Sequence, residues 1–327
     1  MRIIAFFSNK QGVGTTNLVY HLAWMFAELG ERVLAVDLDP QANLTNRFLS
    51  YEQQGILFEE STDASTIYRA FKPLAEGEGE ISPVKVQTIS SHLFLIAGDL
   101  ALSTVEETLG KTWARLEQPD EASCKIQSGI WRILETAGKE IEADLILIDV
   151  GQNLGSLTRT VLLGADDIIF PLNPDRSSCQ NLRNIGPALK SWRNDWQHRA
   201  AINNSSFKTT LPGGTMRPVG YLVLFDLMIA SRGVRSYRAN GNQIPRLYQE
   251  FILEGGPRFA SSPAEDTNYL GGLKGYLNLL SLSLEARKPM FLLRAADGAL
   301  GSAAEAVSDC YAGYKQIAQN IRTRVRN

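Results

Sequence analysis

Short apolar runs alternate with amphipathic segments along most of the chain. Residues 2–7, RIIAFF, are apolar and rich in β-formers, and the segment NLVYHLAWMFAELG that follows repeats its apolar residues at helical spacing. Residues 32–39, RVLAVDLD, form a second apolar run. A strand, a helix and a strand therefore lie within residues 2–39, which is typical of the β-α-β unit of a parallel sheet.

The same alternation predicts an α/β fold with a doubly wound, mostly parallel sheet flanked by helices. Further buried strands are predicted at residues 93–99, 144–151, 166–174 and 218–226. Helices are predicted at residues 124–141 and 180–196, and a C-terminal helix is predicted at about 303–322.

Three stretches are predicted to be loops or insertions. Residues 50–83 are acidic and interrupted by Gly, Ser and Pro around a short helix, ASTIYRAFKPL. Residues 200–217 and 254–268 carry similar turn-forming residues. We expect a single domain over residues 1–327, with a divergent inserted segment at about 50–92.

Composition narrows the class of protein. The 327 residues are 44% hydrophobic and 21% charged with a net charge of −2, so no global charge draws the chain to nucleic acid or membranes. Its three cysteines and three histidines lie far apart, without the spacing of a metal site or a disulfide framework. No apolar run approaches the ~18 residues of a membrane span, and no charged leader precedes the first strand. We expect a cytoplasmic protein without membrane contact.

A glycine-rich loop connects the first predicted strand to the first predicted helix. It comprises Lys10, Gln11, Gly12, Val13, Gly14, Thr15, Thr16 and Asn17. Gly12 and Gly14 let the backbone curl so that several N–H groups point at one anion, and the positive end of the helix dipole adds to this. In the general phosphate-binding pattern a lysine follows the last glycine, whereas Thr15 stands there in this chain.

Four oxygen-bearing residues accompany this loop. Thr16 carries the hydroxyl that usually binds Mg²⁺ in such loops, and Asp149 ends an apolar strand in the manner of a Walker B carboxylate. Asp37 and Asp39, at the tip of the second strand, hold Mg²⁺ through water and orient an attacking water, or else form a solvated turn or a helix cap. Because ligands of parallel sheets bind at the carboxyl ends of the strands, the combination predicts a magnesium–nucleotide site.

These motifs together resemble the ParA/MinD family of deviant Walker P-loop ATPases, which carries K-G-G-V-G-K-T-T, then D-x-D, then a Walker B aspartate. The segment DLDPQAN is similar to the ParA branch. The resemblance covers about 1–50 and 93–322, and residues 285–293 (EARKPMFLL) resemble the segment that leads into the family's last strand and helix.

The resemblance implies ATP and Mg²⁺ as cofactors and an ATP-dependent homodimer, in which Lys10 crosses to the partner's phosphates. It assigns water orientation to Asp39 and the metal shell to Thr16, Asp37 and Asp149. Residues 10–17 would hold the nucleotide, with Asn173 and Pro174 beside the base. Phe225 either stacks on the base or belongs to the core.

Two departures from the family pattern bear on the chemistry. Thr15 replaces the P-loop lysine, and Gln11 replaces a glycine. Two unit charges about 4 Å apart attract by about 4 kcal/mol at an effective dielectric near 20. Losing half of that lowers affinity more than tenfold, since ~1.4 kcal/mol is one decade. We expect nucleotide binding to be weakened but not lost, and hydrolysis to be slow or impaired.

Basic side chains cluster on one predicted helix and at the C-terminus. The candidate DNA-binding residues are Arg183, Lys190, Arg193, Arg322, Arg324 and Arg326. The apolar stripe of the predicted helix points Arg183, Lys190, Arg193 and Arg199 outward. ParA-like proteins hold DNA through such patches without reading its sequence, which would make the protein nucleoid-associated; the alternative is an ordinary solvated surface. The narrow apolar stripe of the C-terminal segment favours packing on the body over a membrane anchor.

The sequence thus predicts a ParA-like nucleotide-dependent dimerisation switch that partitions or positions DNA or a protein cargo, with a protein partner that stimulates turnover. The alternative is a non-catalytic scaffold, derived from an ATPase, that acts through protein contacts. A metabolic P-loop enzyme would need its own acid–base cluster, and the sequence shows none.

Overall fold

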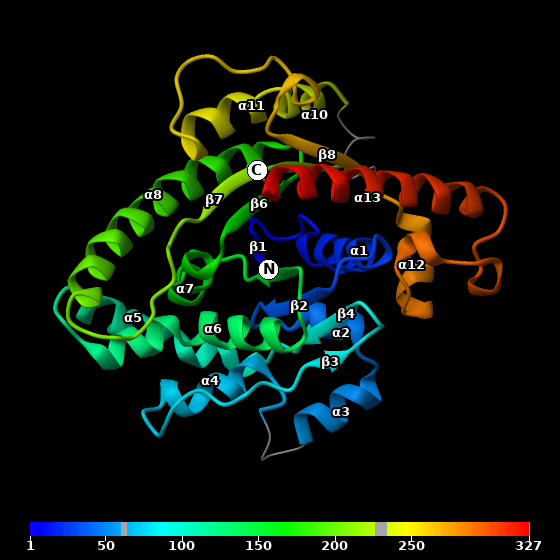
Figure 1. Cartoon of the computed structure of the whole chain (residues 1–327). Coiled ribbons are helices and arrows are strands. Elements are labelled where there is room, and N and C mark those ends of the chain that lie inside the picture. Colours follow the sequence, from blue (N-terminus) through cyan, green and yellow to red (C-terminus); the bar gives the residue numbers. More distant parts are fainter. Residues whose placement is uncertain (60–63, 226–233, 327) are drawn as a thin grey trace.

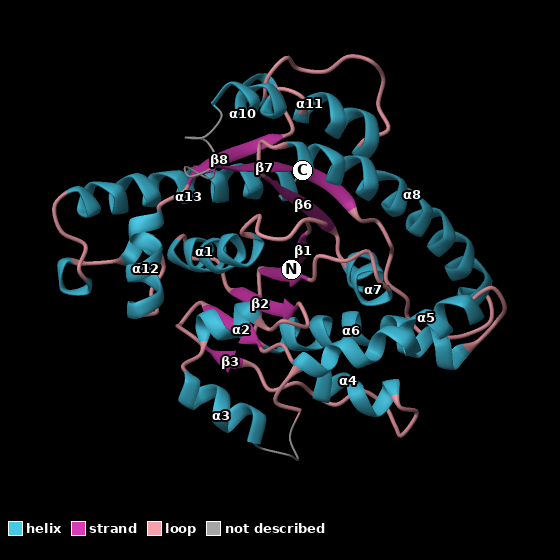
Figure 2. Ribbon diagram, turned by 180° about the vertical axis from the view of Figure 1, so that it is seen from behind, coloured by secondary structure: helices cyan, strands magenta, loops and turns pink. Residues whose placement is uncertain are grey.

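A single eight-stranded sheet forms the centre of the protein. The computed structural model describes residues 1–59, 64–225 and 234–326. The strand order is β3-β4-β2-β5-β1-β6-β7-β8, and every pairing is parallel except the antiparallel edge pair β3–β4. The strands are β1 (Arg2–Phe6), β2 (Val33–Leu38), β3 (Gln87–Thr88), β4 (Leu93–Ile96), β5 (Leu145–Val150), β6 (Asp167–Leu172), β7 (Arg217–Phe225) and β8 (Tyr269–Lys274). Figure 2 shows them running from β8 at the top of the view to β3 at the bottom.

Helices cover both faces of this sheet (Figures 1 and 2). One face packs against α1 (Thr15–Glu28), α2 (Asn43–Phe48), α12 (Leu277–Ala286) and α13 (Ser302–Arg326). The other face packs against α4 (Ile67–Ala75), α5 (Glu106–Arg115), α6 (Glu121–Glu140), α7 (Ser156–Gly164), α8 (Arg176–Asn204) and α11 (Ile244–Leu247). Helices α3 (Tyr51–Glu59) and α10 (Val234–Gly241) complete the main elements. Because both faces are covered, all residues of β2, β5 and β6 are buried, which explains their continuous apolar runs.

The predicted α/β class and six predicted strands are confirmed. Near the C-terminus one strand was missed and one prediction is wrong. Strand β8 was not predicted, because its sequence YLGGLK contains two glycines and no apolar run. Residues 285–293 do not lead into a strand; they end in a short 3₁₀ turn at Met290–Leu292, and the last strand precedes them.

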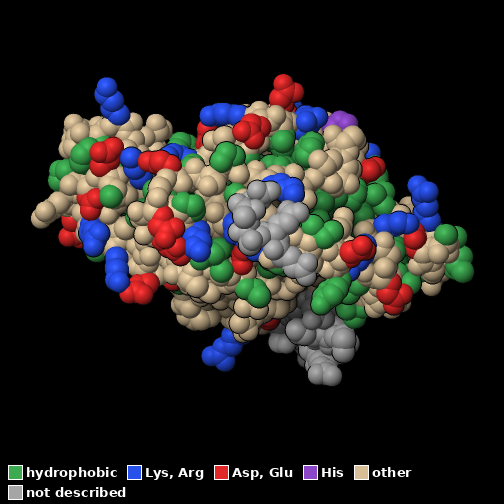
Figure 3. Space-filling view, turned by 90° about the horizontal axis from the view of Figure 1, so that it is seen from below, with side chains coloured by type: hydrophobic (Ala, Val, Ile, Leu, Met, Phe, Trp, Pro, Cys, Tyr) green, Lys and Arg blue, Asp and Glu red, His purple; other side chains and the backbone are tan. Residues whose placement is uncertain are grey.

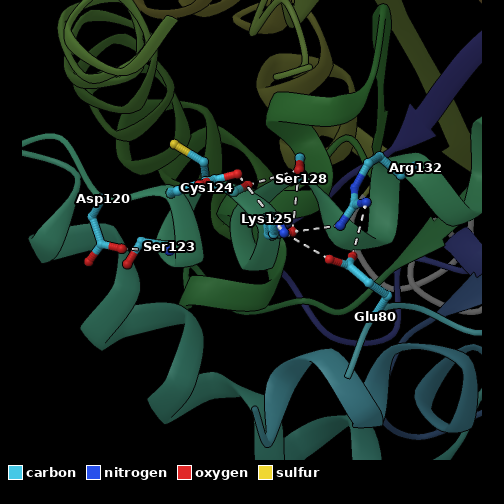
Figure 4. Close-up of polar contacts among 8 residues, drawn as sticks. Glu80, Asp120, Ser123, Cys124, Lys125, Ser128 and Arg132 are labelled. Carbon is cyan, nitrogen blue, oxygen red and sulfur yellow. Dashed lines mark hydrogen bonds and ion pairs between the residues drawn. The ribbon is translucent and has the colours of Figure 1, made fainter. Parts of the chain in front are cut away.

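The inserted segment contacts the body through α6 (Figure 4). Lys125 Nζ donates to Glu80 Oε1 at 2.9 Å, and Arg132 Nη1 lies 3.6 Å from Glu80 Oε2. Asp120 caps the same helix by accepting a hydrogen bond from the Ser123 amide at 3.0 Å. These ion pairs are largely exposed and therefore contribute little to stability, so the apolar packing of α4 on α6 holds the segment in place.

Arg199 corrects the prediction of an outward-facing basic helix. The side chain is only 9% exposed, lies 4.6 Å over the Trp113 ring and donates to Glu117 at 3.0 Å. Trp113 in turn stacks on Trp196 at 5.9 Å. The C-terminal end of α8 thus packs against α5, because the helix continues to Asn204, beyond the predicted end at residue 196.

His21 links α1 to the segment before α13. Its Nδ1–H donates to the Asn17 carbonyl at 2.6 Å, and its Nε2 accepts from the Met290 amide at 3.1 Å. It is fully buried and stacks on Tyr314. Burial lowers the pKa of His21 from 6.5 to about 3. One ring nitrogen donates a hydrogen bond and the other accepts one, as in the neutral imidazole. Protonation of Nε2 would break the hydrogen bond from the Met290 amide, so the folded protein disfavours the charged form.

We predict that His21 makes the fold sensitive to acid. Below pH 6.5 the imidazole of His21 is protonated in the unfolded chain, but in the folded protein it stays neutral down to about pH 3. The contribution of His21 to the free energy of unfolding is therefore fully present above pH 6.5 and is lost as the pH falls. The free energy of unfolding should drop by about 2 kcal/mol from this group between pH 6.5 and pH 4.5. Urea titrations of wild type and His21→Gln test this, since the variant should lose that part of the slope. The exposed His92→Gln is the matched control, and equal slopes in all three proteins contradict the prediction.

Candidate functional site

The glycine-rich loop lies between the end of β1 and the start of α1. Gly12 and Gly14 adopt φ angles of 74° and 94°, in the left-handed region that favours glycine. Gly14 is the N-cap of α1, and its carbonyl accepts the first helical hydrogen bond, from the Leu18 amide at 2.9 Å. A Cβ added at Gly12 would meet no atom within 4 Å. The loop is therefore an open cradle of backbone amides at a helix N-terminus, which suits a phosphate group.

Two cavities meet at this loop. The first, about 230 Å³, has mostly apolar walls and includes Gly12, Gly14, Asn173, Phe225 and Lys274. The second, about 750 Å³, is polar and includes Gly12, Gln11, Asp39 and Glu106. Because Gly12 lines both, the loop lies between an apolar space that can take a base and a polar space open to water.

Thr15 contributes nothing to the surface of the cradle. Its side chain is only 3% exposed, and its hydroxyl has no hydrogen-bond partner among the described residues. The hydroxyl of the next residue, Thr16, instead lies near the Asp149 carboxyl group and lowers its pKa, against the larger effect of burial. Position 15 therefore offers neither a positive charge nor an exposed side-chain donor to a phosphate.

Two buried carboxyl groups lie beside the loop on adjacent strands. Asp37 of β2 is the register partner of Asp149 of β5. Burial raises the pKa of Asp37 to about 7, against the opposing effect of hydrogen bonds from Thr45. Burial and the neighbouring Asp37 raise the pKa of Asp149 well above its usual range. The repulsion between the two groups makes this a place where a cation or a proton is stabilised.

The two aspartates of the DLD motif have different environments. Both the amide and the hydroxyl of Thr45 donate to Asp37 Oδ2 at 2.7 Å, so this carboxyl group fastens the turn between β2 and α2. Asp39 Oδ1 accepts from the Gln41 amide at 3.0 Å, and the residue lines the 750 Å³ cavity. Of the two, Asp39 is placed to contact water in the cavity.

The donors beside the loop suit magnesium. Among the residues that the structure describes, no three His, Cys, Asp or Glu side chains form a ready-made metal cage. Magnesium in nucleotide sites takes only one or two protein oxygens and completes its shell with phosphates and water. Asp149 Oδ2 is buried without a hydrogen-bond partner in the described part of the chain, and the Thr16 hydroxyl lies next to this carboxyl group. These two hard oxygen donors fit the ion.

Lys10 is held by its own chain. Its Nζ donates to Asn173 Oδ1 at 3.0 Å and forms an ion pair with Asp175. Asn173 Nδ2 in turn donates to the Leu224 carbonyl at 2.9 Å, which links the loop to the end of β7. Pro174 lies elsewhere, in a separate 390 Å³ cavity that shares Phe225 with the first one.

Most of the candidate DNA-binding residues contact their own chain. Arg322 and Arg326 pair with Glu31, Arg324 donates to the Thr267 carbonyl, and Arg193 donates to the Met216 carbonyl at 3.1 Å. Glu31, Met216 and Thr267 each lie just before a strand, so these arginines gather at the amino ends of the strands, opposite the glycine-rich loop.

The other two candidates lie on α8, apart from that group. Lys190 pairs with Glu254 at 2.5 Å, and Arg183 lies 6.0 Å from the Phe251 ring centre. On the face seen in Figure 3, basic and acidic side chains are interspersed without a patch of one sign.

Thr45, Glu106 and Lys274 were missed by the sequence analysis. Thr45 and Glu106 follow no motif, although Glu106 lines the polar cavity and accepts hydrogen bonds from the Ser156 and Leu157 amides at the start of α7. Lys274 follows a strand that the pattern did not show. None of the helices described is long and apolar enough to span a membrane.

Comparison with known proteins shows the family of the chain. A model of the AAA domain family matches residues 1–202. The chromosome partitioning protein ParA of Caulobacter vibrioides is 27% identical over 202 residues, which cover 62% of this chain and 67% of that protein.

Two solved structures share the fold. Protein DIP2308 of Corynebacterium diphtheriae has 25% identity and a TM-score of 0.65, covering 88% of this chain and 97% of its own. McdA of Cyanothece in complex with ATP has 12% identity and a TM-score of 0.57, covering 98% and 96%. The eight-stranded, mostly parallel sheet is that of a P-loop NTPase, and the chain belongs to the AAA domain family, among its ParA-like members.

Proposed function

We propose that this protein is a nucleotide-dependent dimerisation switch of the ParA type, which partitions or positions DNA or a protein cargo. The observation that carries the proposal is the open amide cradle at Gly12 and Gly14, with the Thr16–Asp149 pair beside it. The similarity to a chromosome partitioning protein and to an ATP-bound McdA supports it. A phosphate cradle, hard metal donors and an adjoining apolar cavity are the parts that ATP and Mg²⁺ require.

Each residue of the site has a proposed part. The amides of residues 11–16 hold the phosphates, and Asn173 lies on the side of the base, whereas Pro174 lines a separate cavity. Thr16 and Asp149 hold Mg²⁺, which supplies charge neutralisation on the phosphate oxygens. Asp39 orients water from the polar cavity, while Asp37 organises the turn that carries it.

Lys10 is the proposed link between nucleotide and dimerisation. In the structure its ammonium is neutralised by Asp175 of the same chain. To reach the phosphates of a second subunit it must leave this partner, so the ion pair opposes dimer formation. Phosphate oxygens carry more charge than one carboxylate, and bound ATP therefore favours the exchange.

A scaffold without turnover is the competing function, and one observation favours it. The buried Thr15 side chain supplies no charge to the transition state, in which negative charge on the phosphate oxygens must be stabilised. We therefore propose slow hydrolysis that a protein partner stimulates. The scaffold alternative holds if the purified protein binds no nucleotide.

We predict that Thr15→Lys raises ATP affinity at least tenfold and raises turnover. The added ammonium would lie about 4 Å from a phosphate, where half of ~4 kcal/mol suffices for this gain. Calorimetry with a slowly hydrolysed ATP analogue and a phosphate-release assay measure the two effects. Thr15→Ala is the matched control and should leave affinity unchanged, because it removes only an unpartnered hydroxyl.

The Asp39→Ala variant should abolish ATP turnover and spare ATP binding. Brisk turnover by dilute wild-type protein, with no gain in the lysine variant, would refute the prediction.

We predict that Asp175→Asn strengthens ATP-dependent dimerisation about 25-fold, that is, about fivefold for the Lys10 of each subunit. The substitution frees Lys10 from a partly buried ion pair of about 1 kcal/mol. It keeps the N-cap of α8, which accepts from the Ser178 amide at 2.8 Å, because asparagine caps as well as aspartate. Sedimentation with the ATP analogue gives the dimer constant. Asp120→Asn changes the corresponding cap of α6 and is the control; a response shared by both variants argues against the prediction.

We propose that the dimer binds DNA through the arginines at the amino ends of the strands. The interaction should be independent of sequence and should require ATP, because each subunit alone offers few phosphate contacts. Anisotropy on two unrelated duplexes across a salt series measures it. The double variant Arg322→Gln/Arg326→Gln should lower the salt slope by about two per subunit. Lys111→Gln on α5 is the control, and a preference for one duplex would rule out this mode.

A further inference from the structure

Among the described residues, one basic side chain lines the two cavities beside the glycine-rich loop. Of the described residues that line the 230 Å³ and 750 Å³ cavities, Lys274 alone is a lysine or arginine. Lys10 lines neither cavity and is neutralised by Asp175. Among the described residues that line the two cavities, positive charge for a nucleotide therefore comes from the end of β8.

The sheet brings Lys274 toward the loop. A Cβ built on Gly14 would lie 3.8 Å from Leu224 Cδ1, so the end of β7 touches the cradle. Phe225, the next residue, is the register partner of Lys274 on β8. Neighbouring strands lie about 4.8 Å apart, a gap that the long lysine stem can span. Lys274, Gly12 and Gly14 accordingly line the same cavity.

The Lys274 ammonium has no competing partner in the part of the chain that the structure describes. The side chain is exposed, and within the described residues nothing forms an ion pair or a side-chain hydrogen bond with it. An uncommitted ammonium at the mouth of a cavity attracts an anionic ligand without first breaking another ion pair. This distinguishes Lys274 from Lys10, which must give up Asp175.

We propose that Lys274 binds the phosphates of a nucleoside triphosphate within its own subunit, and so supplies the charge that position 15 lacks. The inference rests on the proposed nucleotide-binding function. Binding by this residue needs no second subunit, so the monomer loads nucleotide first. Lys10 acts only afterwards, when two loaded subunits meet.

Calorimetry on the full chain with a slowly hydrolysed ATP analogue tests this inference. Lys274→Gln should weaken binding of the analogue at least tenfold and leave binding of adenosine, which has no phosphate, unchanged. Lys274→Arg should keep most of the affinity, because it keeps the charge. Lys208→Gln, an exposed lysine in the loop after α8, is the matched control and should bind like wild type.

A double-mutant cycle with Thr15→Lys adds a readout that a purely structural role would not produce. If Lys274 substitutes for the missing lysine, the loss caused by Lys274→Gln should shrink when position 15 carries the charge. Wild-type affinity in Lys274→Gln, or equal losses for adenosine and the analogue, would overturn the inference and leave the proposed function standing. A wild-type protein that binds no analogue would overturn both.

Discussion

Two carboxyl groups buried side by side on neighbouring strands are the constraint on which the site depends. Asp37 and Asp149 face each other across β2 and β5, inside a sheet that is covered on both faces. Their mutual repulsion and loss of water are costly, and the donors of Thr45 and Thr16 offset only part of that cost. The remainder must come from a proton or a cation. The same pair therefore opposes folding and underlies the proposed binding of a metal ion.

The two lysines near the loop differ in how readily their ammonium groups can move toward a ligand. Lys10 is paired with Asp175, a residue that also caps α8, whereas Lys274 has no ion-pair partner among the described residues. Position 15, where a positive charge would be permanently at the phosphates, is filled by a buried threonine. In the proposed mechanism, flexible side chains therefore supply the charge that position 15 lacks. The full charge would be present only after Lys10 has exchanged its ion pair with Asp175 for one with the phosphates of a second subunit.

The parallel sheet separates two kinds of surface. Its carboxyl edge carries the glycine-rich loop and the acidic residues, and its amino edge carries the arginines paired with Glu31 and neighbouring carbonyls. Helix α1 joins the two edges, since it begins at the loop and ends just before Glu31. Its 14 residues span about 21 Å, at about 1.5 Å per residue. His21 fastens this helix to the segment before α13, so both edges are built on one rigid element.

The sequence by itself determined the α/β class, the strand–loop–helix unit and the strand that ends in Asp149. These are local properties: apolar periodicity reports which faces are buried, and glycines mark where the backbone turns. Only the tertiary structure decided that Asp37 holds a turn while Asp39 faces a cavity, that Thr15 and Arg199 are buried, and that Lys10 pairs with a residue 165 positions away. It also placed Lys274 beside the loop, from a strand that showed no pattern. Such contacts depend on strand order and on helix packing between distant segments, and no local spacing of residues encodes them.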